Sequence, residues 1–324
     1  MLDVIGHKWF YIVLSGVLVT ASIAAVLWFG LPLGIDFTGG SLLEATFNER
    51  RPEAEELRTA FSASGVKTIT IQLTGERGAL FRFRDIDEET HRMLLNALGL
   101  SAVGNTQVPS DMADSRGDET RFSAIGPTVG RELLIRAGIA IAAALLAIMG
   151  YIAWAFRKVS APVPSWRYGL AAVVALIHDV AIPIGVFAVL GALAHIEMDA
   201  LFVTALLTIM GFSVHDTIVV FDRTRENLIK DRAREGRTER AGISSFGALV
   251  NRSINETLVR SVNTSLTVLF VLIAVAIFGG TTTRYFVVTL IVGIVAGAYS
   301  SIFLASPLLV LQYEWRHRGS AQTD

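Results

Sequence analysis

Long apolar stretches alternate with polar segments along the whole chain. An apolar helix of about 20 residues is long enough to cross the hydrocarbon core of a bilayer. Six stretches reach that length, and we place them near residues 9–31, 133–156, 168–193, 200–221, 258–278 and 284–311. The pattern therefore predicts an α-helical polytopic membrane protein with six transmembrane helices.

The segment between the first two stretches, residues 32–131, has a different pattern. Alternating apolar and β-branched residues predict strands, and apolar residues at helical spacing predict helices. In chain order we expect a strand at 41–47, a helix at 52–64, strands at 67–73 and 80–84, a helix at 88–98, a polar stretch at 109–118 and a strand at 120–125. This β-α-β-β-α-β order predicts one ferredoxin-like α+β domain. Its residues form no evident catalytic cluster, so we interpret it as a binding or lever module.

Composition supports the membrane interpretation and excludes some other classes. Hydrophobic residues make up 52% of the 324 residues, and the mean hydropathy is +0.53. Cysteine is absent, which excludes a disulfide framework and a thiolate metal site. The net charge of −1 gives no indication of a nucleic-acid partner. The first apolar stretch exceeds the roughly 7–15 residues of a signal-peptide core, so we expect an uncleaved span.

The positive charges predict how the helices cross the membrane. Lys8 precedes the first span, and further Lys and Arg lie between the second and third spans, between the fourth and fifth, and after the sixth. Cytoplasmic loops carry such an excess, so both termini are expected in the cytoplasm of a multi-pass inner (plasma) membrane protein. The expected divisions are a first transmembrane helix at 1–31, an extracytoplasmic domain at 32–131, a five-helix bundle at 132–315 with a basic cytoplasmic loop at 222–257, and a cytoplasmic tail at 316–324.

Asp216 is the main candidate for chemistry, because it precedes the end of the fourth span. A charge inside the bilayer costs roughly 2.5–3.5 kcal/mol on insertion scales unless it is compensated. Ser213, Asp216 and Thr217 share one face of this helix. The fifth span begins with a polar stripe that consists of Glu256, Arg260, Asn263, Thr264 and Thr267. Both groups lie toward the same end of antiparallel neighbours, so we predict that Asp216 pairs with Arg260.

Such a pair predicts a proton relay. A carboxylate beside Arg stays ionised, whereas loss of the Arg or drier surroundings favour its protonated form. Because Arg does not deprotonate, Asp216 would carry the proton and Arg260 would be the movable counter-charge. A purely structural buried ion pair is the alternative. His178 and Asp179 form a second intramembrane polar pair that supports the relay or orients helices. His215 projects about 100° away from Asp216 on the helix and receives no role.

Several blocks of residues carry a resemblance to a known family. They are Gly34–Gly40 (GIDFTGG), Gly126–Leu133 (GPTVGREL), Ala175–Val180 (ALIHDV), Gly211–Arg223 (GFSVHDTIVVFDR) and Gly297–Pro307 (GAYSSIFLASP). In this order they resemble the SecF family, the smaller membrane subunit of the SecDF complex of the bacterial protein translocase. The block around Asp216 is the most specific. Position 215 is His where the family often has Asn, and a charged insert at 231–242 lengthens the loop before the fifth span.

The resemblance implies a function in protein transport rather than enzymatic catalysis. The family belongs to the resistance-nodulation-division superfamily of proton-driven transporters, so it implies a SecD-like partner with six further spans. Proton flow would move the outer domains, which hold a preprotein emerging from the SecYEG channel. The family's proton-conducting Asp and essential Arg fall on Asp216 and Arg260. From their positions on the helices, we add as supporting candidates Ser213, Thr217, His178, Asp179, Asn263 and Thr264. No metal, cofactor or nucleic acid is implied.

Three other functions are consistent with parts of the sequence. Half of a proton-driven small-molecule exporter would need a drug-sized pocket, for which an outer domain of roughly 100 residues leaves little room. An intramembrane aspartyl protease would use Asp179 and Asp216 as a dyad, and a nearby Arg260 would oppose the shared proton. A non-conducting assembly factor would need the polar stripes for structure alone.

Overall fold

The computed structural model describes residues 2–49, 51–63, 66, 69–84, 86–102, 116–157, 163–235 and 243–320. Most of the predicted polar stretch at 109–118 lies outside these residues, and so do residues 236–242 of the charged insert. The chain divides into two compact units. The helical unit contains Met1–Leu31, Ile139–Ile196 and Leu201–Asp324, and the sheet unit contains Pro32–Gly138 and Glu197–Ala200.

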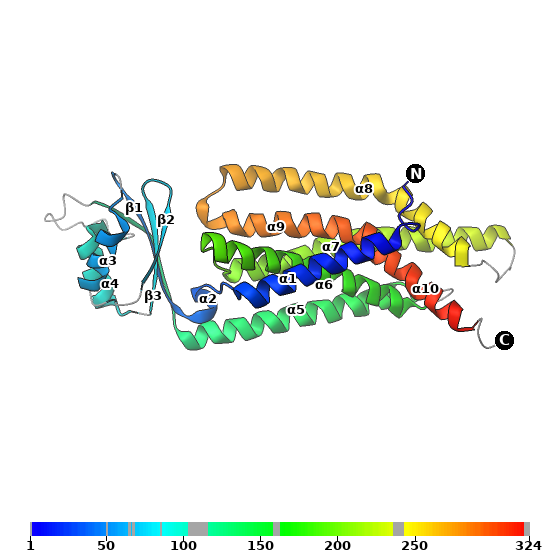
Figure 1. The fold of residues 1–324 in the computed structure, drawn as a ribbon, viewed down its shortest axis with the longest axis horizontal. Helices are drawn as coiled ribbons and strands as arrows, with labels where there is room; N and C mark the ends of the chain where they lie inside the picture. The colour runs from blue at the N-terminus through cyan, green and yellow to red at the C-terminus, as the bar shows by residue number, and fades with distance from the viewer. Residues whose placement is uncertain are drawn as a thin grey trace. The chain divides into compact units, whose positions relative to one another are not determined.

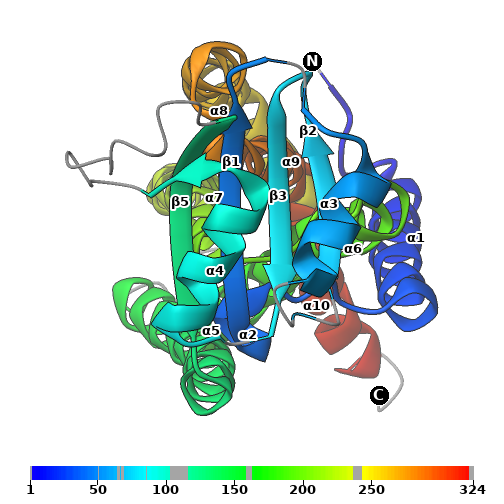
Figure 2. The ribbon, with the colours of Figure 1, turned by 90° about the vertical axis from the view of Figure 1, so that its left-hand side faces the viewer.

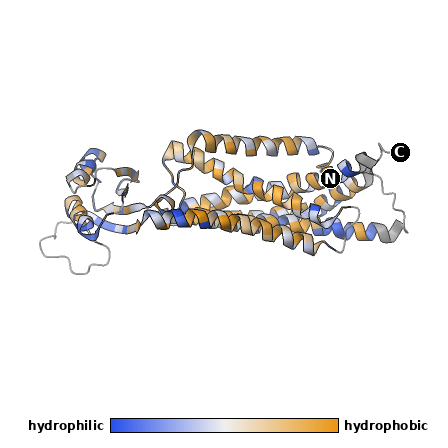
Figure 3. Ribbon diagram, turned by 90° about the horizontal axis from the view of Figure 1, so that it is seen from below, coloured by the Kyte–Doolittle hydropathy of each residue, from blue (hydrophilic) through white to orange (hydrophobic). Residues whose placement is uncertain are grey.

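Six long apolar helices are present, as the hydrophobic pattern predicts. They are α1 (Lys8–Phe29), α5 (Pro127–Ala155), α6 (Ser165–Ala194), α7 (Ala200–Glu235), α8 (Ile243–Phe278) and a last helix formed by α9 (Thr281–Ser300), the π-helical turn η2 (Ser301–Ala305) and α10 (Ser306–Ser320) (Figure 1). Apolar residues dominate along their length (Figure 3). Each is long and apolar enough to cross a membrane, so the chain is a polytopic helical membrane protein.

The basic segment 222–257 was predicted to be a loop, and this prediction is wrong for the described residues. Helix α7 continues to Glu235, and α8 begins at Ile243. Polar contacts join the two extensions beyond the apolar span. The Nδ2 of Asn227 donates to Ser253 Oγ and to Glu256 Oε2, both at 2.9 Å, and Arg252 donates to Asp231. These bonds stabilise two helical ends that hydropathy alone cannot detect.

The second span also starts earlier than predicted. Helix α5 begins at Pro127 rather than near residue 133. Proline is favoured in the first turn of a helix, because its missing N–H has no helical partner there. At Gly130 an added Cβ would lie 2.8 Å from the backbone nitrogen of Gly39 and 3.0 Å from the carbonyl of Phe37. The glycine therefore lets the first turn of α5 approach the Phe37–Gly39 backbone within the sheet unit.

The sheet unit contains the predicted order of strands and helices. Its elements are the short α2 (Ile35–Thr38), β1 (Gly40–Phe47), α3 (Ala54–Ala63), β2 (Ile69–Thr74), β3 (Gly78–Phe83), α4 (Glu88–Leu98), β4 (Leu100–Ser101) and β5 (Gly117–Ile125). The sheet order is β2-β3-β1-β5-β4, and all pairs except β4–β5 are antiparallel. Figure 2 shows α3 and α4 over one face of this sheet. The short α2 and the two-residue β4 are additions to the prediction.

The core of the sheet unit follows from the alternation of its strands. Inward residues such as Leu43, Phe81 and Phe83 pack against Phe61 of α3 and Leu94 of α4. Asp87 caps the start of α4, since its side chain accepts a hydrogen bond from the Thr90 N–H, and Gly99 caps the end in the left-handed conformation. These local signals fix the two helices over the apolar face of the sheet.

The connection between α6 and α7 belongs to the sheet unit. The N–H of Gly34 donates to Met198 O at 2.8 Å, and the N–H of Met198 donates to Pro32 O at 2.6 Å. The backbone N–H of Ala200 donates to Asp36 Oδ2 at 2.7 Å. Arg82 Nε on β3 lies 2.8 Å from Glu197 Oε2. Four residues remote in sequence thus complete the sheet unit and lead directly into α7.

Candidate functional site

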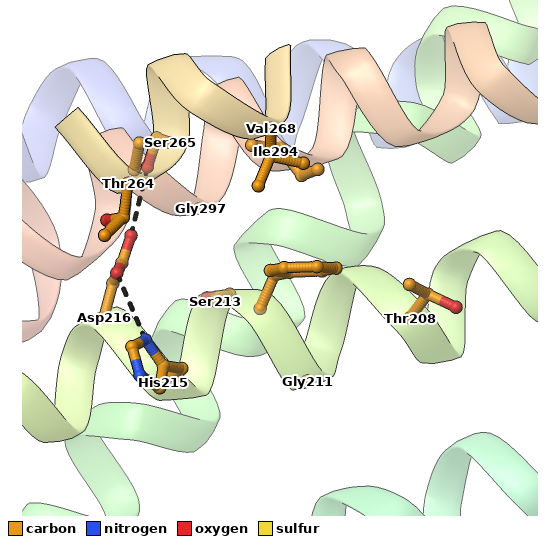
Figure 4. Close-up of a pocket in the computed structure, with 12 residues that line it drawn as sticks. Thr208, Gly211, Ser213, His215, Asp216, Thr264, Ser265, Val268, Ile294 and Gly297 are labelled. Atoms are coloured by element: carbon orange, nitrogen blue, oxygen red, sulfur yellow. Dashed lines mark hydrogen bonds and ion pairs between the residues drawn. The ribbon is translucent and has the colours of Figure 1, made fainter. Parts of the chain in front are cut away.

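Asp216 lies on α7 beside a cavity of about 380 Å³ (Figure 4). The side chain is buried, and residue 216 as a whole is 8% exposed. The cavity wall comes from three helices, with Ser213 and Asp216 on α7, Thr264 and Ser265 on α8, and Ile294 and Gly297 on α9. Most of the wall is apolar, so the Asp216 carboxyl is the one acidic group that faces this space among the residues lining it. The Asp216 carboxyl therefore borders a mostly apolar cavity.

The partners of Asp216 differ from the predicted one. Ser265 Oγ donates to Asp216 Oδ2 at 3.2 Å, and His215 Nδ1 lies 3.6 Å from Asp216 Oδ1. The His215 side chain is 69% exposed, and its ring lies beside the carboxylate of the next residue, Asp216. Helical spacing places the two Cβ atoms about 100° apart, but it does not limit where a long ring ends. The expectation that His215 points away from Asp216 is therefore wrong.

Arg260 does not pair with Asp216. In the part of the chain that the structure describes, Arg260 forms no ion pair, and its side chain is exposed on α8. The face of α8 that is buried carries Thr257, Ser261 and Ser265 instead. These small side chains are four residues apart and allow close helix packing, whereas a guanidinium on that face would have to be buried. The sequence located the polar stripe correctly but not the rotation of the helix.

The predicted stripe is consequently an exposed polar face. Glu256, Arg260, Asn263, Thr264 and Thr267 are all exposed in this chain. Thr264 also reaches the cavity, and its Oγ1 donates to the carbonyl of Arg260 one turn earlier at 3.0 Å. Residues four apart on a helix are neighbours, about 5–6 Å between Cβ atoms. Arg260 thus projects from the helix one turn away from the wall of the Asp216 cavity.

A second polar cluster surrounds Asp179 on α6. Ser213 of α7 and Ser300 of α9 both donate to Asp179 Oδ2, the latter at 2.7 Å. The ring nitrogen Nδ1 of His178 lies 2.8 Å from Asp179 Oδ1. Asp179 and Asp216 are thus bound by separate donors, which does not support a dyad that shares one proton. Ser213 belongs to both places, because it lines the Asp216 cavity as well.

The sequence-predicted residues are partly brought together. Asp216, Ser213 and Thr264 line one cavity, and His178 and Asp179 are connected to it through Ser213. Thr217 is buried beside it and donates to the carbonyl of Ser213 at 3.1 Å. Arg260 and Asn263 lie outside on the exposed face. Among the described residues, no three His, Asp or Glu side chains are placed to hold a metal ion.

Sequence reasoning did not identify Ser265 and Ser300 as part of the site. Ser265 follows Thr257 and Ser261 at four-residue intervals, and Ser300 follows Gly293 and Gly297 in α9. Both belong to stripes of small residues that typically mark helix contacts. These two serines could have been found from their position, because each is a hydroxyl in a stripe of small residues at about the depth of an acidic residue on a neighbouring helix.

Comparison with known proteins identifies close relatives of the whole chain. Residues 107–315 match the family model "Protein export membrane protein SecD/SecF, C-terminal", and residues 29–49 match the SecD/SecF GG motif. The protein translocase subunit SecF of Thermobaculum terrenum is 44% identical over 321 residues, which cover 96% of this chain and 93% of the relative. The subunit SecF of Anaerolinea thermophila is 38% identical over 98% of this chain and 96% of the relative.

Solved structures give the same relationship. The crystal structure of SecDF, a translocon-associated membrane protein from Thermus thermophilus, aligns with a TM-score of 0.78 and 30% identity over 96% of this chain. A second SecDF structure, in a super-membrane-facing form, aligns with a TM-score of 0.65 and 31% identity over the whole chain. This chain spans 38% and 40% of those two SecDF chains.

Proposed function

This chain belongs to the SecD/SecF family of protein-export membrane proteins, and we propose that it couples proton movement to a late step of preprotein export. Its relatives are named translocase subunits, which supports an accessory subunit of the Sec translocase rather than an enzyme. In the proposal it acts with a SecD-like partner and, through it, with a SecYEG channel and the translocating preprotein.

The exposed polar face of α8 is the observation that carries the proposal. A polar face on a membrane-spanning helix is unfavourable against lipid and normally faces protein or a water-filled cavity. Arg260, Asn263, Thr264 and Thr267 form such a face, while exposed apolar residues such as Val262 and Leu266 lie on another side of α8. Since this chain matches 38% of a SecDF chain, a SecD-like subunit is the natural cover for this face.

In this proposal Arg260 lies at the interface with the SecD-like partner, and Asp216 lies in the cavity next to that interface. Among the described residues, the Asp216 carboxyl accepts a hydrogen bond from Ser265, lies 3.6 Å from the His215 ring, and forms no ion pair with Lys or Arg. Contact with the partner would place Arg260 near the cavity or hold it away by a partner carboxylate. An Arg close to the Asp216 carboxyl favours its ionised form, and removal of the Arg favours the protonated form. Alternation between these two arrangements would move one proton per cycle of Asp216.

The orientation follows from the charges. With both termini in the cytoplasm of the inner membrane, residues 32–131 face outward and the basic ends of α7 and α8 face inward. The sheet unit also includes the Glu197–Ala200 connection, which leads into the helix that carries Asp216. The proposal therefore assigns the sheet unit to the extracytoplasmic side, where it would contact the emerging preprotein.

Site-specific cross-linking tests the partner interface. Because the chain has no Cys, a photoreactive maleimide can be attached to a single introduced Cys without further changes. The label at Thr267→Cys is expected to give an adduct with a co-expressed SecD-like subunit. The matched control, Val262→Cys, lies on the apolar side of the same helix and is expected to label lipid. Equal labelling of lipid at both positions would contradict the interface.

Proton flux into vesicles that contain the complex tests the relay. Asp216→Asn and Arg260→Ala are each expected to abolish proton-dependent stimulation of export and to reduce flux at least about a hundredfold, as for loss of a proton-transfer group. Asp222→Asn is the matched control, since it removes an exposed carboxylate from the same helix. Normal flux and export in Asp216→Asn would exclude the relay.

A further inference from the structure

The cluster around Asp179 has a composition that the relay at Asp216 does not use. Asp179 is 0% exposed and His178 is 2% exposed, both in the middle of α6. Two hydroxyls donate to Asp179 Oδ2, and the Nδ1 of His178 lies within hydrogen-bond distance of Oδ1. This is the hydrogen-bond pattern of an ionised carboxylate, which accepts bonds on both oxygens.

His178 leaves one of its two ring nitrogens without a partner. Nδ1 faces Asp179, whereas Nε2 is buried and has no hydrogen-bond partner among the described residues. The ring of Tyr299 stacks on His178 with centroids 5.9 Å apart, so the imidazole is held in place from α9. When Nδ1 carries the hydrogen that is donated to Asp179, Nε2 is a bare acceptor in an enclosed site. It is a place where one further proton can bind.

The charge balance determines how many protons the cluster holds. The groups that face the pair are the hydroxyls of Ser213 and Ser300 and the ring of Tyr299, and no Lys or Arg is bonded to it in the described structure. An ionised Asp179 with a neutral His178 has a net charge of −1, and one added proton makes the pair neutral. A buried uncompensated charge is strongly unfavourable, so the surroundings favour binding of one proton.

Ser213 connects this pair to Asp216. Its hydroxyl donates to Asp179, and the same residue lines the cavity beside Asp216. A Cβ on Gly297 would lie 3.0 Å from Ser213 Cβ, so the glycine makes room for this position. A hydroxyl has one donor hydrogen and two acceptor lone pairs. It can therefore pass its own proton to the Asp179–His178 pair and accept another from a water in the cavity, which leaves Ser213 unchanged.

We propose that His178 and Asp179 form a second proton-binding site, which holds one proton and exchanges it with the Asp216 cavity through Ser213. This inference rests on the proposed proton-driven function and adds a second station to it. The proton that leaves Asp216 enters a cavity water, and the water protonates Ser213 Oγ as that hydroxyl releases its hydrogen to Asp179 Oδ2 of the pair. Return follows the reverse order. Asp179 and His178 bind the proton, and Ser213 is the positioned relay between the two stations.

Infrared difference spectroscopy against pH tests the second site directly, in vesicles that contain the full chain and its SecD-like partner. A pH-dependent carboxyl or imidazolium band is expected in the wild type and in Asp216→Asn. The same band is expected to disappear in Asp179→Asn and to be lost or displaced in His178→Gln. Thr289→Val is the control, because it removes a buried hydroxyl on α9 that donates to Tyr285 O of its own helix. This control is expected to keep the band.

Proton flux in the same vesicles separates a relay from a structural cluster. Ser213→Ala is expected to reduce proton flux at least about tenfold, a smaller loss than the roughly hundredfold one expected when a proton-transfer group is removed. His178→Gln is expected to shift the pH profile of the flux. Absence of any titrating band, together with wild-type pH profiles in Asp179→Asn and His178→Gln, would overturn the second site. Normal flux in Asp216→Asn would instead overturn the relay at Asp216, whatever the infrared result for Asp179.

Discussion

The interactions that the Asp216 carboxyl makes in this chain are weak ones. A hydroxyl hydrogen bond at 3.2 Å and a largely exposed imidazole at 3.6 Å constrain the carboxyl less than a bidentate arginine pair would. An Asp216 locked to Arg within one chain would be harder to protonate than one that has only these partners. The observed arrangement therefore suits a group that alternates between two protonation states more than one with a purely structural task.

Ser265→Ala tests the contribution of the hydroxyl at this position. The change removes the hydrogen bond to Asp216 and leaves the Cβ that packs between α8 and α7. Hydrogen bonds to charged groups contribute roughly 1.5–3 kcal/mol, so flux is expected to change by about tenfold or somewhat more. The measurement is proton flux in vesicles against pH, with Ser261→Ala as the matched control one turn earlier. An effect of Ser261→Ala equal to that of Ser265→Ala would show that helix packing alone is being measured.

At this scale the sequence predicted residue types better than residue contacts. The cost of an intramembrane carboxylate marked Asp216 and Asp179 without any structural information. The partners were not predictable, because a contact depends on how α8 is rotated about its axis. That rotation follows from Thr257, Ser261 and Ser265, whose small volumes permit close packing, and not from the charge of Arg260. Charge complementarity was a misleading guide in this case.

At the scale of elements, α7 and α8 reach well beyond the apolar part of the chain. Each has 36 residues, whereas about 20 are enough to cross a bilayer. The extensions hold together through buried Asn227 and Ser253 and through the partly exposed Glu256 and Arg223. A periodicity of apolar residues cannot show this, because the contacts are polar. Residues 244–254, which precede the fifth apolar span, belong to the continuous helix α8.

Asn227→Ala is expected to loosen these extensions. Asn227 is 3% exposed, and its loss removes one hydrogen bond to a hydroxyl and one to a carboxylate. Together these bonds correspond to about 1–3 kcal/mol of local stability. Hydrogen exchange of residues 224–235 is expected to become about tenfold faster or more, since 1.4 kcal/mol corresponds to a factor of ten. Asp222→Ala removes an exposed pair with Arg225 and should leave that exchange nearly unchanged. Equal exchange in both variants would mean that another contact holds the extensions.

At the scale of the whole molecule, two chain segments that lead out of the helical unit, one after α1 and one after α6, both belong to the sheet unit. The GG-motif segment that follows α1 and the connection between α6 and α7 pair with each other through Gly34, Pro32 and Met198. The order of elements in the sheet unit was predictable from alternation and turn residues. The inclusion of Glu197–Ala200 was not, because four residues in a short loop carry no pattern that links them to a sheet more than a hundred residues earlier.

Glu197 makes this connection sensitive to pH. Burial raises the pKa of Glu197 above its ordinary value of 4.5, and the Arg82 guanidinium opposes the shift without cancelling it. The folded protein therefore binds this proton more tightly than the unfolded chain. The stability that Glu197 contributes is fully present below pH 4.5 and is lost as the pH rises through the higher folded value. A lower pH is therefore expected to stabilise the part of the sheet unit that contains Glu197 and Arg82.

Thermal unfolding of the purified chain against pH measures this effect. Glu197→Gln retains an acceptor oxygen for Arg82 but cannot ionise, so its stability profile is expected to be flatter than that of the wild type just above pH 4.5. In that window the variant should gain stability relative to the wild type as the pH rises, and the two should converge below it. Glu89→Gln, on the exposed side of α4, supplies the control for loss of one carboxylate. If Glu197→Gln instead loses stability as the pH rises, the ion pair with Arg82 outweighs burial, and the connection is strongest when Glu197 is charged.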